Sequence, residues 1–488
     1  MTAISEQTFF LDPDFAGTLQ QQLQHNVASG IVTGRFRPGD RLPSTRRLAD
    51  HLGISRITVT LAYTELLAND YLCARGRSGY FVSDTAPRPP DFAARARTAG
   101  DAVDWSRAIG QRFSGGADLD RPTDWARFPY PFIYGQTDTR LFDHRNWRTC
   151  ALQALGQRDF AALTADQYDR DDPALVDAIA RTILPRRGIA AGANDILVTL
   201  GAQNGLWIAA QVLLTQRRRA AMENPGYPGL RDILAQTRCK TRAVDVDENG
   251  LPPEALSGDE DVVFVTPSHH CPTGATMPLA RRRALLDRAG RDNFLIVEDD
   301  YEFEIAPNDK PAPALKSLDG EGRVIYLGSL SKSVFPGLRL GYLVGAPAFI
   351  REARALRALT LRHPPGHLQR TAAYFLSLGH YDAQVRRLSR VLGERRAVLR
   401  AALARHGLGP SHGDARGGSS LWMQAPEGVD TAALARRLRD RGVLIEPGRV
   451  FFGRDTPDRR HYRLAYSSIP ADRIDEGVAR IADAMRPG

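Results

Sequence analysis

Hydrophobic positions near the start of the chain repeat with the period of an α-helix. Between residues 15 and 34, Leu19, Leu23, Val27 and Ile31 fall on one side of a helix that ends at Gly34. Polar residues occupy the positions between them. The spacing therefore predicts one amphipathic helix at the beginning of the first domain.

Two further helices follow, each preceded by a capping residue. Ser44 precedes "TRRLADHLG", a helix that ends at Gly53, and Ser55 precedes "RITVTLAYTELLAND". The segment "YLCARGRSGYFVS" has the pattern of two short strands around a glycine-containing turn. Helix, helix, short turn, helix and hairpin is the order of a winged helix-turn-helix, which we predict for residues 1–83.

The apolar periodicity is lost between residues 84 and 125. Pro, Ala, Gly, Arg and Asp dominate the segments "APRPPDFAARARTAG" and "SGGADLDRPTD". Six Arg and seven Asp or Glu balance one another, which excludes a basic tail. We predict a mostly extended linker with room for one short helix.

From residue 126 to residue 488, short apolar runs alternate with helical ones. The runs "DILVTL", "RAAMEN", "DVVFVTP", "FLIVEDD", "RVIYLGS" and "LGYLVG" have the length of strands, and "QNGLWIAAQVLL" and "ARRRALLDRAG" lie between them as helices. From about residue 385 a long helix precedes a strand–helix–strand unit that ends in "YRLAYSSI". This alternation predicts an α/β fold with a mainly parallel sheet.

Composition narrows the class of protein. The 488 residues are 43% hydrophobic and 25% charged, ordinary values for a globular chain. No apolar run reaches the roughly 18 residues that a membrane helix needs, and the first residues lack the regions of a signal peptide. Four cysteines at unrelated spacings favour neither a disulfide framework nor a metal site. We therefore expect a cytoplasmic protein that binds no metal and no membrane.

The net charge of +9 permits an anionic partner. The predicted winged helix is nearly neutral, with eight Arg and seven Asp or Glu, so the case for DNA binding depends on where its arginines are placed. A helix-turn-helix places the start of its second helix in the major groove of DNA. Arg56 and Thr58 would face base edges or phosphates, and Arg46 would reach the backbone. Arg75 and Gly76 at the hairpin tip suit the minor groove. The alternative is a small solvated domain whose arginines are only surface charge.

The segment "GRFRPGDRLPSTRRLADHLGISRITVTLAYTELLANDYLCARGRSGYFV" resembles the GntR family of bacterial winged-helix repressors. The shared features are the PG-x-x-LPS-x-R turn, the LA-x-x-LG-x-SR-x-TV helices and a G-x-G-like wing. The resemblance implies double-stranded promoter or operator DNA as a partner, and it implies DNA contacts at Arg46, Arg56, Thr58, Arg75 and Gly76.

Lysine is scarce in the chain, and the only ones are Lys240, Lys310, Lys316 and Lys332. Arginine supplies every other basic side chain and cannot form an imine, because it keeps its proton. Lys332 stands in "SLSKSVFPGLRLGY" beside Ser329 and Ser331, with Arg339 seven residues on. Hydroxyls and a guanidinium can bind a phosphate, and a nearby cation lowers the pKa of a lysine towards the reactive amine. The alternative is an exposed loop lysine; the other three lysines are predicted to lie on the surface.

Pyridoxal phosphate needs such a lysine, an acid at its ring nitrogen, a phosphate cradle and an aromatic face. "LIVEDDYEFEI" places Asp299 just past a buried strand, where it could meet the ring nitrogen, with Tyr301 at the ring hydroxyl. Gly201, Ala202 and Gln203 open a predicted helix whose backbone N–H groups could meet an anion. A carboxylate that caps a turn and an ordinary strand-to-helix turn are the alternatives.

Two more residues could complete such a site. Tyr227 in "ENPGYPG" could cover the cofactor ring, and a plain structural turn explains it equally well. Arg463 in "YRLAYSS" lies on a late strand, where its guanidinium could hold the acid group of an amino compound through two hydrogen bonds.

Residues 126–488 resemble the fold-type-I aminotransferases, which share the S-x-S-K-x-x-x-P-G-x-R-x-G-Y string. The resemblance implies pyridoxal 5'-phosphate as the cofactor, with Lys332 bonded to it, Asp299 at the ring nitrogen, Tyr301 at the ring hydroxyl and Tyr227 stacked on the ring. It implies phosphate contacts from Ala202, Gln203, Ser329, Ser331 and Arg339, and a contact of Arg463 with the ligand carboxylate.

The chain departs from that family in one segment. The enzymes read N-P-T-G where this chain reads "HHCPTG", so Cys271 stands in place of the asparagine that binds the cofactor ring. A thiol is a weak hydrogen-bond donor. This departure argues against transamination and favours a protein that senses an amine.

A GntR-type winged helix joined to an aminotransferase-like domain is the layout of the MocR (GabR-like) regulators, and the chain resembles them from end to end. The resemblance implies a head-to-tail homodimer and an amino-compound effector that forms an external aldimine with the cofactor, releases Lys332 and alters DNA binding. Taurine and ectoine-derived compounds are the candidate effectors. The alternatives are an active aminotransferase and a sensor of the cofactor itself that controls vitamin B6 synthesis.

Overall fold

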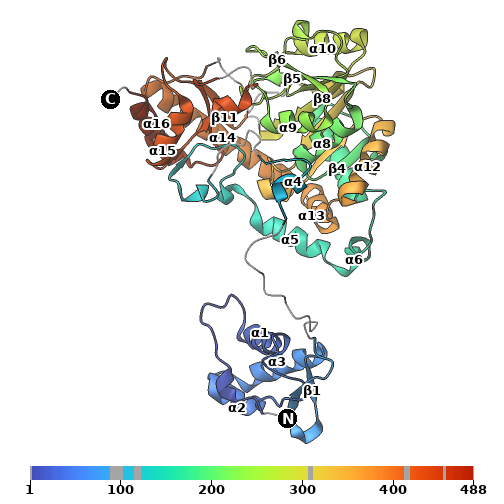
Figure 1. Cartoon of the computed structure of the whole chain (residues 1–488), viewed down its shortest axis with the longest axis vertical. Coiled ribbons are helices and arrows are strands. Elements are labelled where there is room, and N and C mark those ends of the chain that lie inside the picture. The colour runs from blue at the N-terminus through green and yellow to red at the C-terminus, as the bar shows by residue number, and fades with distance from the viewer. Residues whose placement is uncertain are drawn as a thin grey trace. The chain divides into compact units, whose positions relative to one another are not determined.

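The structure is a computed structural model that describes residues 3–87, 103–114, 122–305, 312–411, 418–453 and 458–486 (Figure 1). The chain divides into two compact units, Met1–Arg112 and Phe113–Gly488. The domain boundaries at residues 83 and 125 stay predictions, because much of the predicted linker lies outside the described residues. Its described part contains one short helix, α4 (Trp105–Ala108). Among the described residues, no helix combines the length and the apolar composition that crossing a membrane requires.

The first unit has the predicted order of elements. Three helices precede a hairpin: α1 (Leu19–Val32), α2 (Thr45–Leu52), α3 (Arg56–Ala68), β1 (Leu72–Ala74) and β2 (Tyr80–Val82). The two predicted caps are confirmed, since the Ser44 and Ser55 hydroxyls accept the backbone N–H groups of Arg47 and Ile57. Gly53 ends α2 in the left-handed conformation, with φ 64°.

The core of this unit comes from the predicted apolar positions. Leu23, Val27 and Ile31 of α1 are buried against α3, whose inner face carries Val59, Ala62, Tyr63 and Leu66. Leu19 was expected on the same buried side, but it lies in the first turn of α1 and is exposed. The Tyr63 hydroxyl donates to the Pro43 carbonyl over 3.1 Å, which fixes α3 against the segment before α2. The position of α3 is therefore determined by buried contacts on its inner face.

The second unit is built on a seven-stranded sheet, as the strand pattern predicts. The strand order is β4 (Ile196–Thr199), β10 (Gly341–Val344), β9 (Val324–Ser329), β8 (Leu295–Asp300), β7 (Val262–Val265), β5 (Arg219–Asn224) and β6 (Lys240–Asp245). All neighbours pair in parallel except β10, which runs antiparallel to both β4 and β9. The mainly parallel sheet is confirmed. The edge strand β6 was not predicted, because most of its side chains are exposed and polar.

Helices cover the sheet and bury its central strands. Every residue of β9 is buried, as are all but the first of β8, which is expected for strands covered on both faces. The helices of this unit before the C-terminal lobe are α5 (His144–Ala154), α6 (Gln157–Leu163), α7 (Pro173–Ala178), α8 (Gly201–Leu213), α9 (Pro228–Thr237), α10 (Leu279–Asp292), α11 (Leu315–Leu318), α12 (Pro347–Leu361) and α13 (Gly366–Ser377).

A smaller lobe completes the second unit (orange to red in Figure 1). The long helix α14 (His380–Arg405) leads into it, and β11 (Ser420–Gln424), β14 (His461–Ala465) and β13 (Glu446–Pro447) form its antiparallel sheet. The helices α15 (Thr431–Arg439) and α16 (Ala471–Met485) pack on a common apolar core with α14. Strand β12 (Val443–Leu444) pairs in parallel with β3 (Tyr130–Pro131), so the start of the second unit is held in this lobe.

All strands of the large sheet except β10 have their carboxyl ends at the same edge. β4 and β9 both run antiparallel to β10, so they are parallel to each other and to β8, β7 and β5. The carboxyl ends of β4, β5, β8 and β9 therefore meet, and the segments that follow them carry the residues predicted to bind a cofactor.

Gly53 determines the turn between α2 and α3. A Cβ at this position would meet nothing within 4 Å, so a Gly53→Ala change would act only through the left-handed backbone and cost about 1 kcal/mol. We expect amide exchange over residues 45–68 to become several-fold faster in hydrogen-exchange mass spectrometry. Gly110→Ala, at a glycine with the same open surroundings and no left-handed φ, should leave exchange unchanged. Equal exchange in both variants would contradict this account of the turn.

Candidate functional site

One cavity of about 370 Å³ lies where the carboxyl ends of the strands converge. The structure brings every residue predicted for the cofactor and the effector to its walls. These are Lys332, Asp299, Tyr301, Tyr227, Ala202, Gln203, Ser329, Ser331, Arg339 and Arg463. Their convergence follows from the topology, although Ala202 and Arg463 are 261 positions apart in sequence. The role of each residue stays a prediction.

Lys332 follows β9 and is partly buried at the floor of the cavity. Its Nζ lies 4.3 Å from the centroid of the Tyr134 ring. The guanidinium carbon of Arg463 lies 4.3 Å from the same centroid. The two cations are therefore separated by no more than twice that distance, and an aromatic ring stabilises both of them.

Asp299 is the penultimate residue of β8, so the expectation that it lies just past the strand was wrong. Its side chain faces the cavity, and its Oδ1 has no hydrogen-bond partner among the described residues. Burial raises the pKa of Asp299 to about 7; the charge of Asp300 adds to the rise and Lys332 opposes it. Such a carboxyl is suited to share a proton with a basic nitrogen.

Asp300 points to the other side of the strand, as alternation requires. Its carboxylate accepts hydrogen bonds from Arg187 Nε over 2.6 Å and from the Tyr326 hydroxyl over 2.9 Å. Arg187 also donates to Ser268 Oγ over 2.7 Å. This buried network fixes the end of β8, and with it the direction of Asp299.

The first turn of α8 has the form of an anion cradle. Gly201 adopts φ +79°, a left-handed conformation that favours glycine, and a Cβ there would lie 2.9 Å from an Arg339 nitrogen, so the guanidinium would have to shift. Ser331 Oγ is buried without a hydrogen-bond partner among the described residues, and Ser329 lies beside it on the same wall. Backbone N–H groups, hydroxyls and a guanidinium around one hollow are the donors that a phosphate group requires.

The two predicted tyrosines lie on the cavity wall in different ways. The Tyr227 hydroxyl donates to Gln203 Oε1 over 3.2 Å, which holds the ring beside the start of α8. The Tyr301 hydroxyl donates to the His269 carbonyl over 2.9 Å. Burial raises the pKa of Tyr301 well above its ordinary value, so the hydroxyl keeps its proton. Both rings are available to a flat ligand in the cavity.

Cys271 occupies the wall where the enzymes have asparagine. Its backbone N–H donates to Thr266 Oγ1 over 3.2 Å, and its sulfur accepts a long contact of 3.9 Å from Arg463. Burial raises the pKa of this thiol to about 11, and Arg463 opposes the rise. The group is therefore a neutral thiol at physiological pH.

Arg463 lies on β14 directly opposite Glu446 of β13. Both side chains are buried, and Arg463 Nε donates to Glu446 Oε2 over 2.8 Å. The guanidinium carbon lies 4.6 Å from the Phe451 ring centroid, so rings of Tyr134 and Phe451 both contact the cation. Glu446 stabilises a cation that burial alone would destabilise, and it fixes the direction of the guanidinium towards the cavity.

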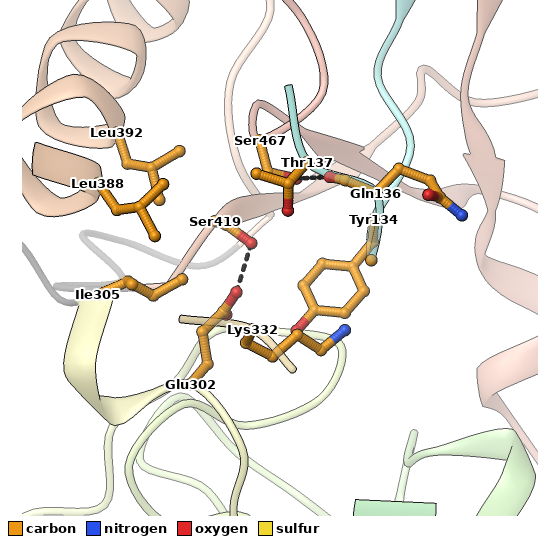
Figure 2. A pocket seen from close by; sticks show the side chains of 11 residues that line it. Tyr134, Gln136, Thr137, Glu302, Ile305, Lys332, Leu388, Leu392, Ser419 and Ser467 are labelled. Carbon is orange, nitrogen blue, oxygen red and sulfur yellow. Dashed lines mark hydrogen bonds between the residues drawn. The ribbon is translucent and has the colours of Figure 1, made fainter. Parts of the chain in front are cut away.

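A second, smaller cavity of about 20 Å³ lies against Lys332 (Figure 2). Its polar wall includes Glu302, whose buried carboxylate accepts the Ser419 hydroxyl over 2.5 Å. Burial raises the pKa of Glu302, while Ser419 and Lys332 oppose the rise. Ser419 immediately precedes β11, so this contact joins the loop after β8 to the smaller lobe.

Sequence reasoning missed Tyr134, Glu302, Glu446 and Phe451. Glu302 stands in the string "LIVEDDYEFEI", but the pattern points to Asp299 and Tyr301 there and not to Glu302. The roles of all four residues depend on which neighbours the fold gives them. Tyr134 is the clearest case, since its segment "YPFIYGQ" carries no charge pattern. A buried acid facing a buried arginine on paired strands is visible only once the register is known.

Two of the other lysines, Lys240 and Lys316, lie away from the cavity. Lys240 begins β6 and is exposed, as expected. Lys316 was expected on the surface, but α11 packs on β8 because Glu298 accepts the backbone N–H groups of Leu315 and Lys316. The Nζ of Lys316 lies 3.2 Å from an Asp319 oxygen. Lys310 lies outside the described residues.

Most of the residues predicted to contact DNA are exposed on the first unit. Arg46 is exposed on α2, and Arg56 is exposed at the start of α3, where its Nε donates to Thr45 Oγ1 over 3.4 Å. Thr58 is half-buried. Arg75 and Gly76 are exposed in the hairpin turn, and Gly76 has φ 50°.

Two families of known proteins match the chain. The family described as "Bacterial regulatory proteins, gntR family" matches residues 19–82, and "Aminotransferase class I and II" matches residues 146–481. Together they cover α1 to β2 of the first unit and nearly all of the second.

Named relatives match along the whole chain. The chain is 58% identical over 487 residues to the HTH-type transcriptional regulator TauR of Rhodobacter capsulatus, covering 99% of this chain and 100% of that protein. It is 31% identical over 482 residues to the probable rhizopine catabolism regulatory protein MocR of Rhizobium meliloti, covering 97% and 95%.

Solved structures match the second unit. The α-aminoadipate aminotransferase LysN of Thermus thermophilus, complexed with N-(5'-phosphopyridoxyl)-L-leucine, has a TM-score of 0.69 at 26% identity and covers 78% of this chain and 98% of that one. The kynurenine aminotransferase of Pyrococcus horikoshii has a TM-score of 0.68 at 25% identity, with 75% and 94% covered.

The predicted fold, a helix-turn-helix followed by an α/β domain of the fold-type-I aminotransferase class, is thereby confirmed. The relatives that span the chain are named as transcriptional regulators, which confirms the prediction of a regulator and not an enzyme. The chain belongs to the MocR-like subfamily of GntR-family transcriptional regulators, on the branch that includes TauR.

Proposed function

We propose that this regulator binds pyridoxal 5'-phosphate in the 370 Å³ cavity and senses a small amino compound there, and that sensing alters its binding to DNA. The observation that carries the proposal is the convergence of Lys332, Asp299, an anion cradle and Arg463 on one cavity. The named ligands of the solved relatives, of which one is a phosphopyridoxyl compound, support it.

The residues present fit this cofactor. Asp299 Oδ1 and Ser331 Oγ are buried polar atoms with no hydrogen-bond partner among the described residues, and such atoms are costly unless a ligand satisfies them. Asp299 would take the ring nitrogen, and the start of α8 with Ser329, Ser331 and Arg339 would take the phosphate. Tyr227 would cover the ring. When bound, the cofactor supplies an electrophilic carbon to which primary amines attach.

Lys332 is the residue that an effector amine would displace. Among the described residues it is the one lysine on the cavity wall, and its Nζ lies against the Tyr134 ring. Arg463 would bind the acid group of the effector, because Glu446 accepts a hydrogen bond from its Nε while its Nη1 lies 3.9 Å from the sulfur of Cys271 on the cavity wall. A sensor of the cofactor alone would have no use for this second cation, so the cavity favours an amine with an acid group.

Taurine is the first effector to test. It joins a primary amine to a sulfonate through two carbons, which matches a lysine and an arginine placed around a single aromatic ring. The 58% identity with TauR favours it over other amines. Ectoine-derived compounds are the second choice.

Glu302 is suited to receive the lysine that the effector displaces. A released Lys332 ammonium would stand beside a buried carboxylate already joined to Ser419 of the smaller lobe. The ammonium would strengthen the contact of Glu302 with Lys332 and weaken the hydrogen bond of Glu302 with Ser419. Effector binding is thereby converted into a difference in free energy between two arrangements of the lobe, as allostery requires.

The regulator is proposed to act as a head-to-tail homodimer, whose two winged helices would read paired half-sites. Exposed apolar side chains support a partner on the second unit. Leu152, Leu155 and Phe160 of the α5–α6 region are each more than half exposed.

Replacing Lys332 with alanine tests the cofactor link. We expect Lys332→Ala to lose the visible absorption band of the bound cofactor and the taurine response, while it retains binding to DNA. Lys316→Ala, which removes a lysine paired with Asp319 outside the cavity, is the matched control and should keep both properties. A normal taurine response in Lys332→Ala would refute the sensing mechanism.

Asp299 should make the cofactor-free protein sensitive to pH. Its pKa in the folded chain is about 7 against an ordinary value of 3.8, so the ionised form is destabilised by folding. Stability falls as pH rises from about 4 to 7, and the penalty, on the order of a few kcal/mol, is complete above pH 7. Asp299→Asn should therefore be more stable than wild type at pH 8 and equal to it at pH 4, by thermal unfolding. With cofactor present it should bind that cofactor more weakly. A stability difference that does not change with pH would contradict the assignment.

Glu302→Gln tests whether binding of the effector can be separated from the change in DNA affinity that follows it. The variant should retain the cofactor band and its change on addition of taurine, because Glu302 lines the smaller cavity and not the larger one. The taurine-dependent change in DNA affinity should fall several-fold, measured by fluorescence anisotropy. Glu321→Gln, at an exposed carboxylate paired with Arg323, should respond as wild type does. A full DNA response in Glu302→Gln would exclude this residue from the coupling.

A further inference from the structure

The outer face of α3 carries a stripe of four side chains that lie away from the buried core of the domain. Ile57, Thr60, Leu61 and Thr64 are spaced by three and four residues, so they lie on one face of the helix, opposite the buried Val59. Ile57 is 70% exposed and Leu61 is 49% exposed. We call these four residues the α3 stripe.

The two threonines of the stripe do not offer a free hydroxyl proton. Thr60 Oγ1 donates to the Arg56 carbonyl over 2.9 Å, and Thr64 Oγ1 donates to the Thr60 carbonyl over 2.9 Å. The stripe therefore contains two aliphatic side chains and two hydroxyl groups that already donate within the helix. It has no donor to offer to the acceptors of a base edge.

Charge around the stripe points to DNA as its occupant. Arg46 and Arg47 are exposed on α2, and Arg56 is exposed at the N-terminus of α3, where its contact with Thr45 keeps the guanidinium at the flank of the helix. Arginines at the flanks can contact phosphates, and the centre of the recognition helix then meets base edges.

The major-groove edges of the four bases offer donors and acceptors, and thymine alone adds an apolar group, its 5-methyl. We propose that Ile57 and Leu61 contact thymine 5-methyl groups in the major groove, so that operator preference at these positions depends on a methyl contact and not on a hydrogen bond. Ile57 lies in the first turn of α3 and Leu61 in the second, so two nearby thymines are expected in each half-site. The inference rests on the first unit and is independent of the cofactor and the effector.

Uracil-for-thymine substitution tests the contact, because it removes the methyl and keeps base pairing. The wild-type full-length chain is first used to select duplexes from a random-sequence library, without effector. Each thymine of a selected site is then replaced singly by deoxyuridine, and affinity is measured by fluorescence anisotropy at fixed salt. We expect one or two positions in each half-site at which affinity falls about fourfold, the effect of exposing one buried methyl-sized group.

Variants assign these positions to side chains. Ile57→Ala should abolish the uracil penalty at one position and Leu61→Ala at another, since the methyl then has nothing to contact. Leu19→Ala removes a leucine of similar exposure, 47%, from α1 and should retain every penalty. Arg46→Ala should weaken binding to all duplexes equally and keep the penalties, as expected of a phosphate contact.

Three outcomes would overturn the proposal. The first is a wild-type chain that shows no uracil penalty at any thymine. The second is a penalty that persists at every position in both Ile57→Ala and Leu61→Ala. The third is a change of oligomeric state in these variants, measured by light scattering, with all uracil penalties intact, which would assign the α3 stripe to a protein contact. Both side chains are exposed, so circular dichroism of the variants should match the wild type and exclude misfolding.

Discussion

Parallel strands that end at one edge of a buried sheet impose the constraint on which the rest of the second unit depends. Because β4, β5, β8 and β9 share a direction, the segments that follow them meet in one hollow. A lysine, a carboxyl group and the N-terminus of a helix lie around this hollow because each follows or ends one of these strands, so none needs a separate long-range contact to place it there. The smaller lobe then closes it with Arg463, so the cavity lies between two parts of one chain.

Buried charges make this arrangement costly, and ion pairs compensate two of them. Arg463 is paired with Glu446 across two strands and packed against two aromatic rings. Asp300 accepts hydrogen bonds from Arg187 and Tyr326 through its Oδ2, although its Oδ1 has no hydrogen-bond partner among the described residues. The Oδ1 of Asp299 also lacks such a partner, and burial raises the pKa of this carboxyl to about 7. A buried carboxyl that faces a cavity in this way marks the place where a ligand completes the structure.

Much of the fold could be predicted from the sequence, because strong local signals agree with it. Ser44, Gly53 and Ser55 determine helix ends through short-range hydrogen bonds and backbone preference, and β8 and β9 are apolar runs of strand length. The strand β6 was missed because an exposed edge strand needs no apolar pattern. Tyr134 and Glu446 were missed because their importance depends on which residues lie opposite them in space. Lys316 was wrongly predicted to lie on the surface, because the sequence does not show that Glu298 of the sheet accepts hydrogen bonds from the first backbone N–H groups of α11.

The left-handed backbone at Gly201 and its close approach to Arg339 restrict position 201 in two separate ways. Any other residue there would strain the backbone and would place its Cβ 2.9 Å from an Arg339 nitrogen, so the guanidinium would have to move. Loss of Arg339 would remove the second restriction and leave the first. The glycine should therefore persist in descendants that have abandoned the cofactor and lost the arginine.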